Sequence, residues 1–457
     1  MADVFEAFRN VSLDNYKLDP AHYVSSPQLG WDAMMHETDC ELTLINDKAM
    51  FAMIDDGLRG GVSMISKRHA KANNKYMGTR YNPSKPSTYI MYWDANNLYG
   101  WAMSQSMPCG DFNWVDEQEF SQIDWTQQQP HQPFGYFVEC DLDYPQSIHN
   151  RHNDYPLAPE RFHLDYKILS ETQVSLRRNY AMPHSSGTVK LVPNLLPKEK
   201  YMVHYLNLKF YLQHGMVLTK VHRVIKFRQS QWLAPYIQKN QDLRAAAANE
   251  FEKDFFKLMN NAVYGKTCEN VKKRTDIKLL TNAIKARTLV DKPHCIGFKV
   301  FGESLMGVNM RKVKVLIDKP FYVGFAVLEL SKLHMYRFHY EYIQQKYGPK
   351  AKLLFTDTDS LMYEIETEDA YQEMYNDREL FDLASYPHTN QFYDPTNNKV
   401  SLHTLSHHCP IIVCVGSTCG DNTFSISILF DIYMCLYLFF FHCLLVGDRE
   451  VQGRGNR

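Results

Sequence analysis

The chain has 457 residues, of which 45% are hydrophobic and 13% aromatic. This is enough apolar sequence for two or three globular units, and it excludes a disordered protein. The formal net charge of -1 excludes overall basicity, so contact with nucleic acid would have to depend on local patches. The 10 cysteines form no CxxC pair and no zinc-type cluster with histidine, and no secretory signal pattern begins the chain. We therefore expect a reduced, intracellular protein, nuclear or cytoplasmic.

The first half of the chain mixes helical and strand patterns. A helical pattern covers residues 2–16, and the apolar segment "TYIMYWDANNLYGWAM" at residues 88–103 predicts a strand. Residues 105–200 are rich in Pro, Gln and His, which predicts loops with short strands. Residues 198–215 predict a helix that Gly215 ends, followed by the strand-like "VLTKVHRVIKF".

The second half has stronger patterns. Two helices are predicted at residues 231–249 and 250–266. Between Lys266 and Lys319 there are 13 Lys or Arg and 5 Asp or Glu, a local net charge of +8, in a segment that alternates like strands. This basic segment is either a solvated face or a surface for phosphates. A helix at residues 325–348 and a hairpin at residues 353–365 complete the pattern.

The hairpin "LLFTDTDSLMYEI" has two aspartates, Asp357 and Asp359, at its polar tip. Carboxylates held this close repel each other, and burial raises the pKa of at least one unless a cation compensates. A bound cation is one interpretation. A solvated turn is the other, because Asp, Thr and Ser are common turn residues.

Two further segments carry polar side chains that suit the same chemistry. Asp94 lies at the end of an apolar strand, although aspartates often end strands. On the second predicted helix, Lys253, Lys257, Asn261 and Tyr264 share one face, which is either functional or simply solvated. Carboxylates for divalent ions, cations for a triphosphate and an aromatic wall for a sugar are the requirements of phosphoryl transfer.

Three segments, in the order "DANNLYG", "KLMNNAVYG" and "FTDTDS", resemble motifs A, B and C of family B DNA polymerases. They are most similar to the protein-primed viral and organellar branch, which includes polymerases of Polinton or Maverick-like transposons. The similarity extends through "HNDYPLAPE", "KEKYMVHYLNL" and "KPFYVGFAVLELSKLHMY" and covers about residues 1–400. It implies an α+β fold: a polymerase palm with an antiparallel sheet and flanking helices, two-helix fingers and β-rich inserts.

The resemblance assigns roles to individual residues. Asp94 and Asp359 match the metal-binding aspartates, with Asp357 as the third catalytic carboxylate, and the implied cofactors are two Mg²⁺ or Mn²⁺ ions. Tyr99 matches the ring under the deoxyribose. The residues that match nucleotide-binding positions are Leu98, Tyr99, Arg244, Lys253, Lys257, Asn261, Tyr264 and Gly265.

The resemblance implies DNA contacts in the segment "LRGG", in the basic segment and at Thr358 in the hairpin. The segment "LRGG" resembles the Y-x-G-G template loop of the branch, with Leu58 in place of the tyrosine. The basic segment lies where relatives have a second terminal-protein region that encircles DNA. The predicted DNA-binding residues are Gly60, Gly61, Lys272, Lys273, Arg274 and Thr358.

The domain organisation follows from the same resemblance. The predicted units are a pre-palm segment and exonuclease remnant (1–85), a first palm segment with motif A (86–150), a first terminal-protein-like insert (151–231), fingers (232–265), a second insert (266–319), a second palm segment with motif C (320–400) and a tail outside the family (401–457).

Some features depart from the family pattern. "MADVFEAFRN" resembles the helix after the last exonuclease motif, so we expect proofreading to be absent, and Asn97 and Gly100 stand where Ser and Pro are more usual. The similarity ends near "YDPTNNKV", before the lysine motif and the thumb. The apolar run at residues 426–446 is long enough for a membrane span. It is either a tail anchor or, as we favour, sequence from a misread or interrupted gene.

The function that these patterns favour is DNA-directed DNA synthesis by two-metal phosphoryl transfer, in a protein from a mobile element or virus-like replicon. The expected partners are DNA primer-template, dNTPs and a terminal protein as primer, and a membrane only if the tail is genuine. The alternative is a truncated, inactive relic that binds nucleic acid weakly. Reverse transcriptase is a distant third interpretation, because its motif C pairs adjacent aspartates and here Thr358 separates them.

Overall fold

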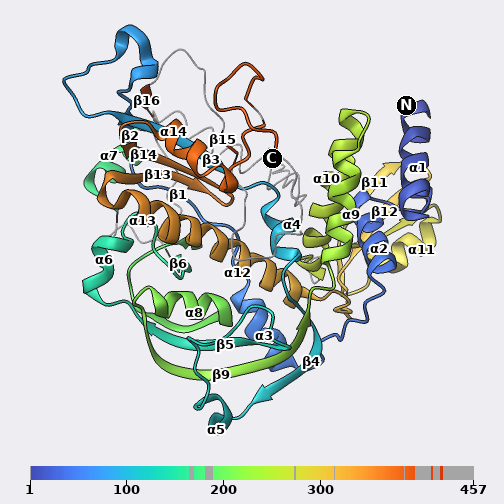
Figure 1. Cartoon of the computed structure of the whole chain (residues 1–457). Coiled ribbons are helices and arrows are strands. Elements are labelled where there is room, and N and C mark those ends of the chain that lie inside the picture. Colours follow the sequence, from blue (N-terminus) through green and yellow to red (C-terminus); the bar gives the residue numbers. More distant parts are fainter. Residues whose placement is uncertain are drawn as a thin grey trace.

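The computed structural model describes residues 2–163, 169–180, 189–271, 274–312, 314–384, 386–396, 413–414 and 423–425. Its strand pairs are antiparallel, and helices flank the sheets (Figure 1). This architecture confirms the predicted α+β class. Of the expected DNA-binding residues, Lys272 and Lys273 lie outside the described residues, as does the apolar run at residues 426–446.

The five-stranded sheet has the strand order β1-β13-β14-β3-β15. The predicted hairpin is confirmed as β13 and β14, and buried side chains alternate along β14 and β3 because one face of the sheet packs on the core. The strand bounds are β1 Ser63–Ile65, β3 Thr88–Asp94, β13 Ala351–Asp357, β14 Ser360–Glu366 and β15 Val413–Cys414.

The predicted strand at residues 88–103 is too long. It ends at Asp94, and helix α4 (Leu98–Met103) follows. The break occurs at Asn97, whose φ of 54° is in the left-handed region and cannot continue a strand. Gly100 allows this turn, because a Cβ at that position would lie 2.5 Å from Asn97 Cγ. The two departures from the family pattern at positions 97 and 100 are therefore coupled.

A second sheet, of four strands in the order β4-β9-β5-β8, lies on the other side of helix α12 (Figure 1). Its bounds are β4 Met107–Val115, β5 Phe134–Asp143, β8 Lys198–His204 and β9 Val217–Ser230. The strand predicted after Gly215 is confirmed as β9. The prediction of loops with short strands at 105–200 is wrong for β4 and β5, which are long.

The helix predicted at 198–215 is correct only in its second half. Residues Lys198–His204 form β8, and helix α8 (Tyr205–Gln213) begins afterwards. The buried run at 201–204 suits a strand or a helix equally well, since a short apolar run has no distinguishing period. Pairing with β5, for example Val203 with Val138, makes it a strand.

Four helices lie together on one side of the molecule (Figure 1): α1 Ala2–Tyr16, α2 Ser26–Thr38, α9 Ala234–Ala245 and α10 Glu250–Thr267. The last two confirm the predicted helix pair. The Asn249 side chain caps α10 by accepting a hydrogen bond from the Glu252 amide at 3.0 Å. α10 packs closely on α2, because Gly30 has no side chain: a Cβ at this position would lie 3.1 Å from the Ala262 Cβ.

Helix α12 (Phe321–Arg337) crosses the molecule between the two sheets (Figure 1). Its residues 321–336 are all buried, as expected of a helix surrounded by protein. A π-helical segment, η5 (Phe338–Ile343), and α13 (Gln344–Tyr347) continue it, close to the predicted end at 348.

The remaining elements lie around this frame. The basic segment is β-rich as predicted, with β10 Asp276–Leu280, β11 Cys295–Gly302, β12 Leu305–Met310 and α11 Ala283–Val290. The other strands are β2 His69–Lys71, β6 Glu160–His163, β7 Val189–Val192 and β16 Thr423–Ser425. The other helices are α3 Lys48–Gly57, α5 Glu117–Phe120, α6 Gln146–His152, α7 Glu171–Asn179, α14 Ala370–Asn376 and the 3₁₀ helices η1 Pro20–His22, η2 Lys75–Arg80, η6 Gly348–Lys350 and η7 Arg378–Leu380.

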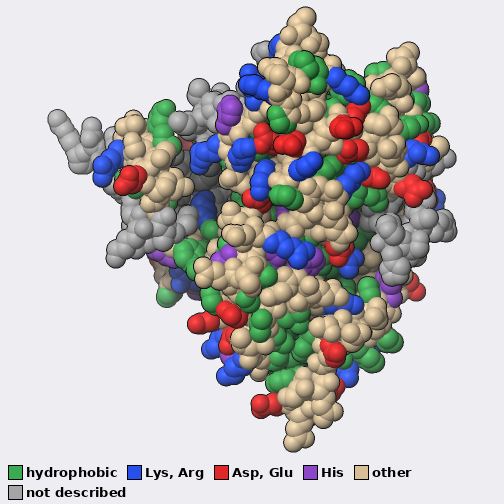
Figure 2. Space-filling view, turned by 60° about the vertical axis from the view of Figure 1, so that its left-hand side comes forward, with side chains coloured by type: hydrophobic (Ala, Val, Ile, Leu, Met, Phe, Trp, Pro, Cys, Tyr) green, Lys and Arg blue, Asp and Glu red, His purple; other side chains and the backbone are tan. Residues whose placement is uncertain are grey.

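The surface in Figure 2 carries Lys and Arg side chains interspersed with Asp and Glu, in keeping with the small net charge. Within the described ranges, no helix has the length and apolarity needed to cross a membrane.

Candidate active site

The two acidic segments meet at one end of the five-stranded sheet. Asp94 is the last residue of β3, and its register partner on β14 is Ser360, which follows Asp359. The Ala95 amide donates a 2.7 Å hydrogen bond to the Asp359 carbonyl, which fixes the two aspartates side by side. Strand pairing thus brings together two segments that lie far apart in the sequence.

The turn between β13 and β14, which we call the acidic turn (residues 357–360), is sharply bent. Thr358 has a φ of 57°, in the left-handed region that non-glycine residues seldom adopt. The Asp359 amide donates to the Asp357 carbonyl at 2.6 Å. Asp357 is the last residue of β13, and Asp359 directly precedes β14.

The carboxyl groups of Asp94 and Asp359 are partly buried, and both have a raised pKa. Burial, and then the negative charge of Asp359, raise the pKa of Asp94 to about 7, and the positive charge of Lys257 offsets this to some extent. Burial likewise raises the pKa of Asp359, with Asp357 adding to the rise and Lys257 opposing it. Among the described residues neither carboxylate forms an ion pair.

Asp357 has a different environment. Its carboxylate accepts a hydrogen bond from Ser63 Oγ on β1, and Thr358 Oγ1 lies 3.5 Å from the same oxygen. Ser63 is also its register partner in the sheet. The sequence reasoning missed Ser63, and its place two residues after Gly61 was the available signal. Asp357 is thus held by the protein itself.

These carboxylates suit a divalent cation. Hard ions such as Mg²⁺ prefer carboxylate oxygens and complete their shell with water and substrate phosphate. Asp94 and Asp359 offer such oxygens, and the positive charge of Lys257 offsets their raised pKa only in part. In the described ranges of the chain, no group of three His, Cys, Asp or Glu side chains is close enough to hold a metal ion by itself. The donor set therefore fits an ion that shares its ligands with water or substrate.

Helix α10 presents the cation of the site. Lys257 is exposed and is the positive charge that acts on the pKa of both Asp94 and Asp359. Asn261 and Gly265 are exposed one and two turns further along. Lys253, predicted on the same face, instead pairs with Glu250 at 2.7 Å. Arg244 is exposed in the last turn of α9.

An aromatic pair links the two motifs. The rings of Tyr99, on α4, and Tyr264, on α10, are stacked with centroids 4.2 Å apart and an interplanar angle of 27°. Burial raises the pKa of both phenols, to about 12 for Tyr99. The neighbouring Leu98 is buried in the core. The structure therefore brings together the predicted sugar-facing ring and the predicted base-pair-facing ring.

The segment "LRGG", which we call the glycine loop (residues 58–61), lies against the acidic turn. The Thr358 amide donates to the Val62 carbonyl at 2.9 Å. A Cβ on Gly61 would lie 2.8 Å from Thr358 Cβ, which real Cβ atoms do not tolerate, whereas a Cβ on Gly60 would meet nothing within 4 Å. Gly61 is required for this close approach, and Gly60 is not.

The basic segment forms a cavity of about 580 Å³, whose lining also includes Asp276 and Asp318. Arg274, whose contact with DNA stays a prediction, forms a bidentate pair with Glu269 at 2.7 and 2.9 Å and also faces Asp318 at 3.6 Å. Its charge is already neutralised. The other basic residues around the cavity are Lys278, Lys292, His294, Arg311, Lys312 and Lys314.

Together, the acidic sheet end, the lysine-bearing helix and the stacked rings bring parts of all three motifs close to one another. Residues 62–343 match the family described as DNA polymerase type B, organellar and viral. The match covers more than half of the chain, and the chain belongs to this family. The resemblance to family B DNA polymerases is thereby confirmed; motifs A and B lie inside the matched range, and motif C, at residues 355–360, lies after it.

Three solved structures of phi29 DNA polymerase are also similar to the chain. They are a post-translocation complex with primer-template DNA (13% identity, TM-score 0.44), a ternary complex with primer-template DNA and incoming nucleotide substrates (14%, 0.42) and a complex with single-stranded DNA (14%, 0.42). Each aligns with 79% of this chain, which spans about half the length of those polymerases. No curated protein sequence matches the chain.

Proposed function

We propose that the chain is a DNA-directed DNA polymerase, which adds deoxynucleotides to the 3′-hydroxyl of a primer. The observation that carries this proposal is the convergence of Asp94 and Asp359, both with raised pKa, opposite the exposed Lys257. Unpaired carboxylates that face a cation are costly for a fold and suit a site that binds metal and phosphate. Membership of the polymerase family supports the same function.

Asp94 and Asp359 would hold divalent ions, Mg²⁺ or Mn²⁺, and we propose two of them. Such ions, when bound, lower the pKa of the primer hydroxyl and neutralise charge on the triphosphate. Asp357, held by Ser63, keeps the acidic turn in place and adds negative charge beside the ions. It therefore supports the site more than it binds metal.

The other residues have roles in binding the nucleotide. Lys257 binds the triphosphate, and Lys253 and Arg244 are secondary cations. Leu98, at the start of α4, fixes this helix in the core. Tyr99 forms the floor under the sugar, and Asn261, Tyr264 and Gly265 line the nascent base pair. Lys253 would have to leave Glu250 to contribute, so we expect its effect to be smaller than that of Lys257.

DNA itself would contact two surfaces. The template would lie along Gly60, Gly61 and Thr358, and the phosphate backbone would meet the basic residues around the cavity of the insert. A terminal protein as primer and an origin in a mobile element also belong to this proposal, and they depend on the branch of the family that the motifs resemble.

Replacing Tyr99 with valine is expected to weaken the rejection of ribonucleotides by about 10- to 100-fold, because the ring that blocks a 2′-hydroxyl is removed. Single-nucleotide extension with dNTP and rNTP, compared as kcat/KM ratios, measures this. Tyr99→Phe keeps the ring and its stacking on Tyr264, and it should discriminate like the wild type. An unchanged ratio in Tyr99→Val would exclude the proposed role.

The proposed function is tested by extension of a labelled primer on a DNA template with Mg²⁺ or Mn²⁺. Addition that follows the template sequence and is lost with EDTA supports it. A well-folded chain that binds DNA but adds no nucleotide under any of these conditions would instead favour the inactive relic.

A further inference from the structure

A buried ion pair in helix α12 lies beside the glycine loop and has no place in the chemistry described so far. Glu329 and Lys332 pair at 3.1 Å, and their side chains are 1% and 3% exposed. Burying a charged pair gains little or no stability over well-packed apolar side chains. The second oxygen of Glu329, Oε2, accepts no hydrogen bond within the described residues, so even the pair is incompletely satisfied. Stability alone does not explain it.

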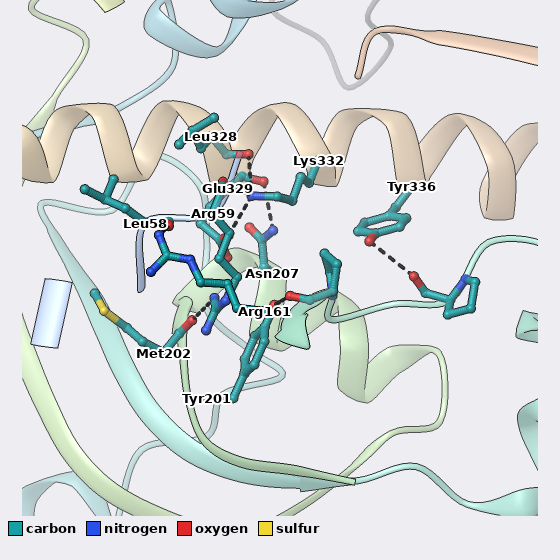
Figure 3. Close-up of polar contacts among 12 residues, drawn as sticks. Leu58, Arg59, Arg161, Tyr201, Met202, Asn207, Leu328, Glu329, Lys332 and Tyr336 are labelled. Atoms are coloured by element: carbon teal, nitrogen blue, oxygen red, sulfur yellow. Dashed lines mark hydrogen bonds and ion pairs between the residues drawn. The ribbon is translucent and has the colours of Figure 1, made fainter. Parts of the chain in front are cut away.

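The contacts of the ammonium group indicate another role. Lys332 Nζ donates to Glu329 Oε1, to the Arg59 carbonyl at 2.9 Å and to the Leu328 carbonyl at 3.4 Å. An ammonium group has three N–H donors. Here one donor faces the helix carbonyl of Leu328, one the carboxylate of Glu329 and one the carbonyl of Arg59 in the glycine loop. Figure 3 shows Lys332 reaching from α12 to the main chain at Arg59, with Asn207 below it. One of its bonds thus leaves the helix and ends on the glycine loop.

Arg59 is anchored from the other side as well. Its guanidinium donates to the Met202 carbonyl at 2.8 Å and lies 3.8 Å above the Tyr201 ring (Figure 3). Arg161 donates to the carbonyl of the preceding residue, Leu58, at 2.7 Å. The side chain of Arg59 is therefore tied to β8, and its main chain is tied to α12.

The next residues carry this constraint to the acidic turn. Gly61 abuts Thr358, the Val62 carbonyl accepts from the Thr358 amide, and Ser63 donates to Asp357. A shift of the loop at Arg59 would be transmitted over two residues to the turn that holds Asp357 and Asp359.

We propose that Lys332, neutralised by Glu329, is a positioning residue: it fixes the glycine loop through the Arg59 carbonyl and thereby sets the acidic turn. The link to catalysis rests on the proposed polymerase function, whereas the link to the position of the turn does not. Lys332 acts through the loop and touches neither nucleotide nor metal.

The test removes both charges together, as Lys332→Met with Glu329→Gln, so that no unpaired charge stays buried. The matched control is Lys198→Met with Glu160→Gln, because Lys198 is also buried (0% exposed) and pairs with Glu160 at 2.7 Å but does not bond to the glycine loop. Hydrogen exchange is measured on peptides that cover residues 58–66 and 353–361, together with extension kinetics.

We expect amide exchange in these two peptides to accelerate at least tenfold in the Lys332/Glu329 variant and to stay unchanged in the control. The variant's kcat should fall at least tenfold with KM for dNTP within about threefold, because substrate contacts remain while the turn is misplaced. Unchanged exchange at 353–361 would overturn the proposal. Absence of extension by the wild type would overturn the proposed function, and the exchange result would still decide the positioning role.

If the double variant does not fold, Lys332→Gln replaces it. Glutamine is shorter, so it can donate to Glu329 but not reach the Arg59 carbonyl as well. The same local acceleration is expected, and its absence would again overturn the proposal.

Discussion

Replacement of Asp94 with asparagine is expected to lower kcat for nucleotide addition by a factor on the order of 10³ or more. An amide cannot replace a charged oxygen ligand, and bound ions supply several kcal/mol of transition-state stabilisation. Single-turnover primer extension at saturating Mg²⁺ measures the loss. The control is Asp143→Asn, because Asp143 ends β5 as Asp94 ends β3 but is exposed. Activity near the wild-type level in Asp94→Asn would refute the proposed centre.

The same substitution should stabilise the metal-free protein at neutral and higher pH. The pKa of Asp94 is raised from 3.8 to about 7, so the folded state binds this proton more tightly than the unfolded state. The resulting stabilisation is complete below pH 3.8 and is lost as the pH rises through 7. Because the carboxyl is partly exposed, we expect Asp94→Asn to exceed the wild type by only about 1–2 kcal/mol at pH 8.

Thermal unfolding in EDTA between pH 4 and pH 8 tests this expectation. The two proteins should have similar stability at pH 4 and diverge as the pH rises to 8. Adding Mg²⁺ should then stabilise the wild type more than the variant by mass action. If the difference in stability between the two proteins does not depend on pH, the pKa of Asp94 is not raised in the folded state.

Replacement of Gly61 with alanine is the second change with a large expected effect. The added methyl group would overlap Thr358, whose main chain is fixed by its left-handed φ and by its bond to Val62. We expect a loss of about 1–3 kcal/mol in the free energy of unfolding, typical of overpacking. We also expect a fall of at least tenfold in kcat, because relief of the clash moves the acidic turn.

Gly60→Ala is the matched control for this prediction. It adds the same methyl group one residue earlier, where nothing lies within 4 Å. Urea unfolding and primer extension are measured on both variants. They distinguish a clash that is specific to position 61 from a loop in which any added methyl group is harmful. Equal effects of the two substitutions would contradict the packing argument.

The local elements that the sequence predicted best are those with a strong periodic pattern or explicit end signals. The hairpin at β13 and β14 combines apolar runs with a polar tip, and α10 combines a capping asparagine with an amphipathic pattern. The error at Lys198–His204 arose because a short buried run has no period of its own, and its partner strand is distant in the sequence.

The candidate site shows the same division. Which residues carry carboxylates, amines and rings was evident from the three motifs. That Lys253 pairs with Glu250 and Arg274 with Glu269 was not, because a side chain of either charge can find more than one partner. The roles assigned to individual site residues, and the domain boundaries, stay predictions.

The sequence by itself determined the family and the chemical groups of this protein, since motifs A, B and C each specify residue types at short, fixed spacing. Only the tertiary structure decided that Asp94 meets Asp359, that Gly61 abuts Thr358 and that Lys332 holds Arg59. Those contacts join residues far apart in the chain, and strand register and helix packing, which depend on the whole core, bring them within bonding distance.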